Sequence, residues 1–293
     1  IIFLLLIFSY FNVSLIFVLY FLIIIFLLNF SNMIINKTYN LIYSNNNWLV
    51  FLIVLFLSIN LSVNLELGWD AQNYWVIKYL NFKKELGIEN LSSLARPDYP
   101  YLGSYIWAVF SETNLLKHEY FGRIYYIYIF CLSLNRLVNL SKFNIIEKSL
   151  LYLSLIFLIF NLNLINGYQE IVIFSYLIIL SIYSMYHLQN KFNIIDFCLL
   201  GLNCFILFWI KNEAMIYALI IIFTLFLFSE KKKAYLFLTA VVIISARYLI
   251  YEYLGLETEL QSGNYDQLKI HDLLQFIDLD RFYLIFKYFI IAH

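Results

Sequence analysis

Proline, glycine, cysteine and charged residues are all scarce in this chain. Its 293 residues include two prolines, eight glycines and three cysteines, and only 13% are Asp, Glu, Lys or Arg. The cysteines stand inside apolar runs and form no CxxC pair, which argues against a disulfide framework and a cysteine-rich zinc site. The formal net charge is +0, so the basic footprint of a nucleic-acid-binding protein is missing, and we expect no nucleic acid among the partners.

Several catalytic signatures are also missing. The sequence has neither a glycine-rich phosphate loop nor a GxSxG elbow, which makes nucleotide hydrolysis and serine-hydrolase chemistry poor explanations. The four histidines are scattered, and His271 with Asp272 supplies only two adjacent ligands, fewer than a zinc site needs. We therefore predict no cofactor and no metal site, and a divalent cation stays an open alternative.

Apolar residues are abundant instead, at 63% of the chain, with 20% aromatic residues. They form repeated continuous runs near the ~20 residues that cross a bilayer core, whereas a membrane barrel would need short alternating strands. We predict an all-α polytopic membrane protein, one transmembrane domain over 1–293 with about nine spans. Because the chain begins without Met and ends inside an apolar run, we expect it to be a fragment at both ends. The expected spans are 4–28, 48–64, 119–138, 148–166, 170–188, 195–210, 214–229, 234–254 and 281 onward.

Lysine and arginine in the short connections predict the orientation. They fall on alternate connections and so on one face, which the positive-inside rule makes cytoplasmic. The opposite face receives two larger loops, 65–118 and the acidic 255–280. We expect an integral protein of the bacterial inner membrane, with its active face extracytoplasmic. The cytoplasmic residues on this interpretation are Lys37, Arg136, Lys142, Lys148, Lys191, Lys231, Lys232 and Lys233.

The first outer loop, 65–118, contains the longest polar interval of the chain. After Asp70 we predict one helix to Gly87, whose stripe of Trp75, Tyr79, Phe82 and Leu86 lies at headgroup level, with Lys78 mostly off the stripe. Both prolines stand in 96–100, which is therefore expected to be irregular. The apolar run 101–110 is too short to span, and predicts an interfacial or re-entrant helix packed against protein.

Two interpretations stay open for each charged group of this loop. Asp70, next to Trp69, suits a general base, but an aspartate before a helix is equally a preferred N-cap. Arg96 offers a planar fork for a phosphate, or neutralises Asp98 within a structural turn. Glu119 and Arg123, spaced i and i+4, form either part of a site or an ordinary intrahelical pair.

Further charged groups stand at the outer ends of later spans. Glu170, Lys211 and Glu213 lie on the same face as Asp70 and can converge with it in one polar pocket, although helix ends commonly carry charge. Arg247 lies deep in a span, where we expect a buried acidic partner or a lipid phosphate.

The order of these features resembles membrane glycosyltransferases of the GT-C superfamily, in the branch of protein mannosyltransferases and lipid A aminoarabinose transferases. The likeness runs through Gly68-Trp69-Asp70, Pro100 to Gly103, and Glu119 with Arg123, and covers roughly 48–230. The stretches WDAQNYW, RPDYP, GYQE and WIKNEA are also similar to a bacterial polytopic family described only as glycosyltransferase-like.

The resemblance implies transfer of a sugar from a polyprenyl-phosphate donor to a lipid, glycan or protein acceptor. It gives Asp70 the work of a general base or of acceptor binding, and the donor phosphate then falls to Arg96, Lys211 or Arg123. The usual acidic pair of the first loop is Asp70 followed by Ala71 here, which favours a metal-independent site. The remaining pocket residues on this interpretation are Trp69, Asp98, Tyr99, Glu119, Glu170 and Glu213.

Three other classes compete with this one. A transporter or flippase for a lipid-linked or polar solute is the main alternative, but it predicts broken helices and related halves that the sequence does not display. A polysaccharide polymerase or ligase would favour an arginine-rich second loop, and 255–280 is acidic. A purely structural membrane protein is the remaining one.

Overall fold

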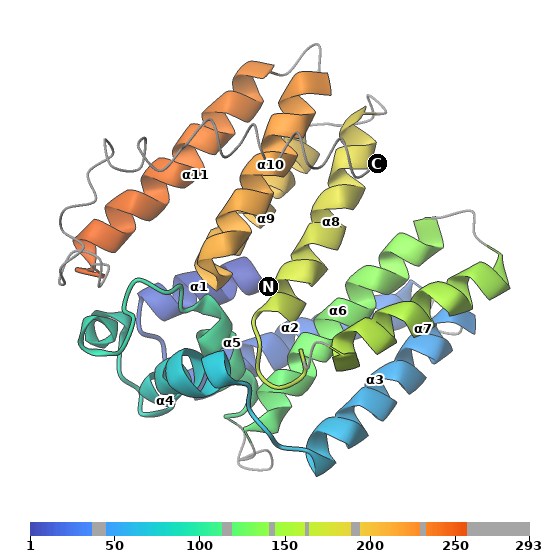
Figure 1. The fold of residues 1–293 in the computed structure, drawn as a ribbon, viewed down its shortest axis with the longest axis horizontal. Helices are drawn as coiled ribbons and strands as arrows, with labels where there is room; N and C mark the ends of the chain where they lie inside the picture. The colour runs from blue at the N-terminus through green and yellow to red at the C-terminus, as the bar shows by residue number, and fades with distance from the viewer. Residues whose placement is uncertain are drawn as a thin grey trace, which may run out of the picture.

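Every element in the described part of the chain is a helix (Figure 1). The computed structural model describes residues 1–36, 45–112, 119–140, 144–161, 164–188, 194–228 and 233–256. Over these ranges no strand occurs, so the all-α prediction is confirmed there. The elements are α1 (Ile2–Tyr10), α2 (Leu15–Ile35), α3 (Asn45–Val63), the π-helical turn η2 (Ala71–Trp75), α4 (Val76–Lys83), the 3-10 helix η3 (Ile88–Ser93), α5 (Leu102–Phe110), α6 (Tyr120–Leu140), α7 (Ile145–Asn161), α8 (Glu170–Leu188), α9 (Ile194–Ile210), α10 (Asn212–Phe228) and α11 (Lys233–Tyr253).

Two helices are long and apolar enough to cross a membrane. The qualifying stretches are Leu15–Asn32 in α2 and Tyr235–Tyr253 in α11, and shorter apolar helices occur in α3, α8, α9 and α10. Seven of the expected spans coincide within a few residues with helices, namely α3 and α6 to α11, but of these only α11 also passes the test of length and apolar character. The span from 281 and the loop 257–280 lie outside the described residues.

The first expected span, 4–28, is wrong as a single helix. The chain forms α1, turns over 11–14, and starts again as α2. Asn12 adopts a left-handed backbone with φ 50°, which asparagine tolerates better than most residues. Ser14 then precedes α2 with extended dihedrals. An Asn and a Ser inside an apolar run are therefore enough to end a helix that hydropathy alone continues.

The outer-loop elements pack into one end of the bundle (Figure 1). Helix α5 contacts α1, α2, α4, α6 and α9, so it is enclosed on most sides. Its residues Leu102 to Val109 are all buried, and the ring of Trp107 lies 5.2 Å from that of Tyr79. The short helix predicted over 101–110 is confirmed, and it packs against protein.

The helix after Asp70 differs from the prediction in two ways. It ends at Lys83 rather than Gly87, and the Asn81 side chain donates to the carbonyls of Leu86 and Gly87 just beyond it. The rings of the aromatic stripe also face protein instead of lipid, because they are buried against α5 and neighbouring elements. The buried rings are those of Trp75, Tyr79 and Phe82.

A close approach between α5 and the start of α8 explains one glycine of the Pro100–Gly103 stretch. A Cβ on Gly103 would stand 1.7 Å from Oε1 of Gln169, which is itself fully buried. The Gly103 carbonyl accepts a hydrogen bond of 2.5 Å from the Tyr126 hydroxyl on α6. Any side chain at this position would therefore have to displace the buried Gln169 amide.

We predict that Gly103→Ala destabilises the fold by about 1–3 kcal/mol, the usual cost of overpacking. The matched control is Gly201→Ala in α9, where the added Cβ meets only a Thr239 methyl at 3.1 Å. Both changes gain the same helix propensity, about 1 kcal/mol, so their difference isolates the clash. Thermal midpoints in detergent measure it, and equal midpoints would contradict the packing described.

Candidate functional site

Four charged side chains meet where α8, α10 and the segment before α4 come together. We call Asp70, Glu170, Lys211 and Glu213 the outer cluster. The Lys211 ammonium, in the turn between α9 and α10, pairs with Glu170 and lies 4.0 Å from Glu213 Oε1. Burial lowers the pKa of Lys211. The hydrogen bond to Glu170 and the negative charges of Glu170, Glu213 and Asp70 together raise it by more, so the net shift of the pKa is upward. Lys211 is thus a fixed cation at neutral pH.

Asp70 does not act as an N-cap, so that interpretation is wrong. Its backbone is helical, with φ −61° and ψ −38°, whereas an N-cap residue has non-helical dihedrals. Its side chain makes no capping hydrogen bond, and among the described residues its carboxylate accepts none. Asp70 is half-buried directly before η2. π-helical turns of this kind are frequent at functional sites.

Aromatic rings line the side of the site next to Asp70. Trp69 is 66% exposed, and its ring meets that of Tyr74 edge-on at 5.7 Å. Tyr74 meets Tyr99 at 5.1 Å, and Tyr99 stacks on the buried Trp75 at 5.7 Å. Trp69 and Tyr99, which the sequence proposes for a substrate pocket, therefore belong to one row of rings.

In the proline turn, Arg96 and Asp98 form the ion pair that is expected if they have a structural role. Arg96 Nε lies 3.5 Å from Asp98 Oδ1, and the guanidinium covers the Tyr99 ring at 4.6 Å. The Asp98 side chain is buried, while 29% of the Arg96 side chain stays accessible. Arg96 has a left-handed backbone, φ 53°, so this turn is held by tertiary contacts.

Lys78 is the main contact that holds this turn, and the sequence prediction placed it wrongly. It is fully buried, and its ammonium nitrogen donates to the carbonyls of Arg96, at 2.8 Å, and Tyr99. Burial lowers the pKa of Lys78 to about 7, with Asp98 opposing and Arg96 adding to the shift. Its spacing of three from Trp75 and four from Phe82 puts it on the buried face, which is the signal that could have found it.

Arg123 is not available to a phosphate, because every guanidinium nitrogen is engaged. It is 1% exposed, and its Nε lies 2.7 Å from Glu119 Oε1. The terminal nitrogens donate to Glu119 Oε2 at 2.9 Å and to the carbonyls of Leu65, Glu66 and Ile165 at 3.0–3.4 Å. The expected i,i+4 ion pair of Glu119 and Arg123 is present as part of a larger tether, and the donor-binding role of Arg123 stays a prediction that this burial disfavours.

Arg247 likewise lacks the acidic partner that the sequence predicts. Its terminal nitrogens donate to the Phe208 carbonyl at 2.7 Å and to the Asn212 side-chain oxygen, and the guanidinium covers the Tyr251 ring at 4.8 Å. Over the described ranges no carboxylate forms an ion pair with it. Arg247 thus links α11 to Asn212, the residue that follows Lys211. The sequence could not predict this role, because the partner lies on another helix.

Metal ligands do not gather in the described part of the chain: no group of three or more His, Cys, Asp or Glu side chains stands close enough together there to hold an ion. His271 and Asp272 lie outside the described residues.

No protein-family model, curated protein or solved structure matches this chain. The likeness to membrane glycosyltransferases stays a prediction.

We predict that Arg123→Lys destabilises the protein by about 3–5 kcal/mol, because a lysine leaves buried carbonyls and Glu119 without partners. Glu119→Gln should cost clearly less, since the bonds to Leu65, Glu66 and Ile165 remain. Thermal midpoints of both variants in detergent test this order. If both variants lost little stability and lost it equally, Arg123 would contribute only an ordinary intrahelical ion pair with Glu119.

The lowered pKa of Lys78 predicts that the stability of the fold depends on pH. Its folded-state pKa of about 7 lies below its ordinary 10.5, so the unfolded chain binds more protons between these values. Stability from this group is therefore full above pH 10.5 and lost as pH falls to 7, by up to about 1.4 kcal/mol per pH unit.

The thermal midpoint of the wild type should rise relative to Lys78→Met as the pH goes from 7 to 10. Lys84→Met, which removes an exposed lysine just after the same helix, is the control and should follow the wild-type slope. Parallel curves for wild type and Lys78→Met would contradict the assignment.

Proposed function

We propose that this chain is an integral membrane glycosyltransferase with a GT-C-like bundle of about nine spans. It transfers a sugar from a polyprenyl-phosphate donor to a lipid, glycan or protein acceptor on the extracytoplasmic face of the bacterial inner membrane. One observation carries the proposal: the half-buried Asp70, whose carboxylate accepts no hydrogen bond from the described residues, stands beside a fixed cation and a row of aromatic rings.

Asp70 serves as the general base. The acceptor hydroxyl oxygen attacks the anomeric carbon and its proton passes to the Asp70 carboxylate, while the bond from that carbon to the donor phosphate oxygen breaks. The electron pair leaves with the polyprenyl phosphate, so a single displacement inverts the anomeric centre. A carboxylate within reach of the acceptor proton typically contributes 10²–10⁴-fold to such a step.

The leaving phosphate needs a cation more than a proton, because it is already ionised at neutral pH. Lys211 supplies this charge, since its raised pKa keeps it protonated beside Asp70. The accessible edge of Arg96 is the second candidate. Arg123 is dropped from the donor site because the protein engages all its nitrogens, and with Glu119 it positions the segment before Asp70.

The aromatic row supports the choice of a sugar as the transferred group. The exposed Trp69 ring presents a flat apolar surface beside the outer cluster, with Tyr74 and Tyr99 behind it. Aromatic faces of this kind stack on the C–H faces of sugar rings, while the carboxylates of Glu213 and Glu170 accept from hydroxyl groups.

The experiment is a sugar-transfer assay on the full chain in lipid, with labelled polyprenyl-phosphate sugars. Asp70→Asn should lower the release of polyprenyl phosphate at least about 100-fold. Glu66→Gln, which neutralises an exposed carboxylate four residues upstream, is the matched control and should keep wild-type turnover. Full turnover by Asp70→Asn removes the base assignment. Solute movement across proteoliposomes with no donor consumed would establish the transporter alternative instead.

A further inference from the structure

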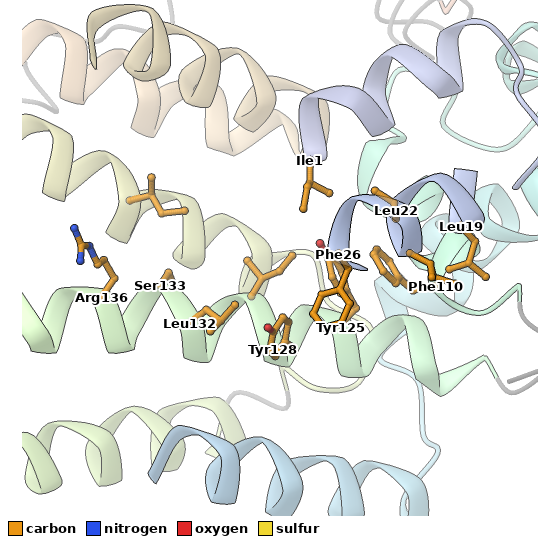
Figure 2. A pocket seen from close by; sticks show the side chains of 13 residues that line it. Ile1, Leu19, Leu22, Phe26, Phe110, Tyr125, Tyr128, Leu132, Ser133 and Arg136 are labelled. Atoms are coloured by element: carbon orange, nitrogen blue, oxygen red, sulfur yellow. The ribbon is translucent and has the colours of Figure 1, made fainter. Parts of the chain in front are cut away.

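A long apolar groove lies away from the outer cluster, between α2, α6 and α8 (Figure 2). It has a volume of about 620 Å³. Tyr125, Tyr128 and Leu132 of α6 form one wall, and Leu22 and Phe26 of α2 close one end. Nearly all of its lining is aliphatic or aromatic, so the groove suits a hydrocarbon chain.

The other end of the groove carries a charge. Arg136, near the end of α6, belongs to the lining, and Figure 2 places it at the far end of the row from Phe26. Its side chain is exposed, and among the described residues it makes no hydrogen bond or ion pair. An exposed arginine at the end of an apolar groove offers its guanidinium to an anionic partner.

The dimensions of the groove match one leaflet of a bilayer. Its α6 wall runs from Tyr125 to Arg136, which at ~1.5 Å per residue is roughly 16 Å. The hydrocarbon core is ~30 Å thick, so an acyl chain of one leaflet would fill this length. On the positive-inside assignment Arg136 lies at the cytoplasmic face, where anionic lipids concentrate.

We propose that this groove binds an anionic phospholipid of the cytoplasmic leaflet, with its phosphate on Arg136 and one acyl chain along α6. The planar guanidinium fork fits two phosphate oxygens. The site is distinct from that of the sugar donor, because Arg136 stands thirteen residues from Arg123 on the same helix, roughly 20 Å toward the opposite end. The inference therefore stands independently of the proposed glycosyl transfer.

Native mass spectrometry of the full chain tests the proposal, after extraction from vesicles that mix phosphatidylglycerol with phosphatidylcholine. The wild type should retain phosphatidylglycerol in preference to phosphatidylcholine. Arg136→Gln should reduce that retention about tenfold, the loss of a charge-assisted contact. Leu132→Trp fills the groove at a partly exposed position and should reduce retention of both lipids.

The control is Lys148→Gln, which removes one positive charge at the same end of the bundle, in the first turn of α7 and outside the groove lining. It should retain phosphatidylglycerol like the wild type. Equal retention by wild type and Arg136→Gln would overturn the proposal, as would retention without headgroup preference. Absence of any bound lipid would overturn it equally, and a changed oligomeric state or stability of Leu132→Trp would then assign the groove to a second copy or another segment.

Discussion

The buried guanidinium of Arg123 is the contact on which the geometry of the site depends. It joins α6 to the end of the segment after α3, through the carbonyls of Leu65 and Glu66, and to the connection before α8, through Ile165. The same two segments meet again where the Gly68 N–H donates to the Asn166 carbonyl at 2.8 Å. Because Asp70 follows the first segment and Glu170 the second, this tether sets the position of one carboxylate relative to the other.

Cations in this protein fall into two groups that differ in their partners. The buried Lys78 and the partly buried Arg247 donate to carbonyl or amide oxygens, and the buried Arg123 donates to main-chain carbonyls as well as pairing with Glu119. Those at the accessible edge, Arg96 and Lys211, face carboxylates instead. A buried unpaired charge is costly, so carbonyl acceptors are how the fold holds its internal cations. The edge cations remain within reach of an anionic substrate.

The two proposed sites use opposite properties of the same helix. The N-terminal end of α6 carries Arg123 and closes the polar site, whereas its middle and C-terminal end form a greasy wall that ends at Arg136. The helix has 21 residues and is roughly 31 Å long, and it places Arg123 and Arg136 roughly 20 Å apart. On the two proposals, one helix would link sugar transfer at one face with lipid binding toward the other.

The sequence alone determined the helical elements that follow from long apolar runs, because burial of a continuous apolar stretch forces its backbone to hydrogen-bond internally. It also indicated which charged residues share one end of the bundle. Tertiary structure alone decided the roles of those residues. The break at Asn12, the buried Lys78 and the carbonyl partners of Arg123 and Arg247 all depend on contacts with distant or irregular segments. A hydrophobic pattern indicates how apolar each position is. The role of a cation depends on which acceptor lies next to it in the folded chain, and that acceptor is distant in the sequence.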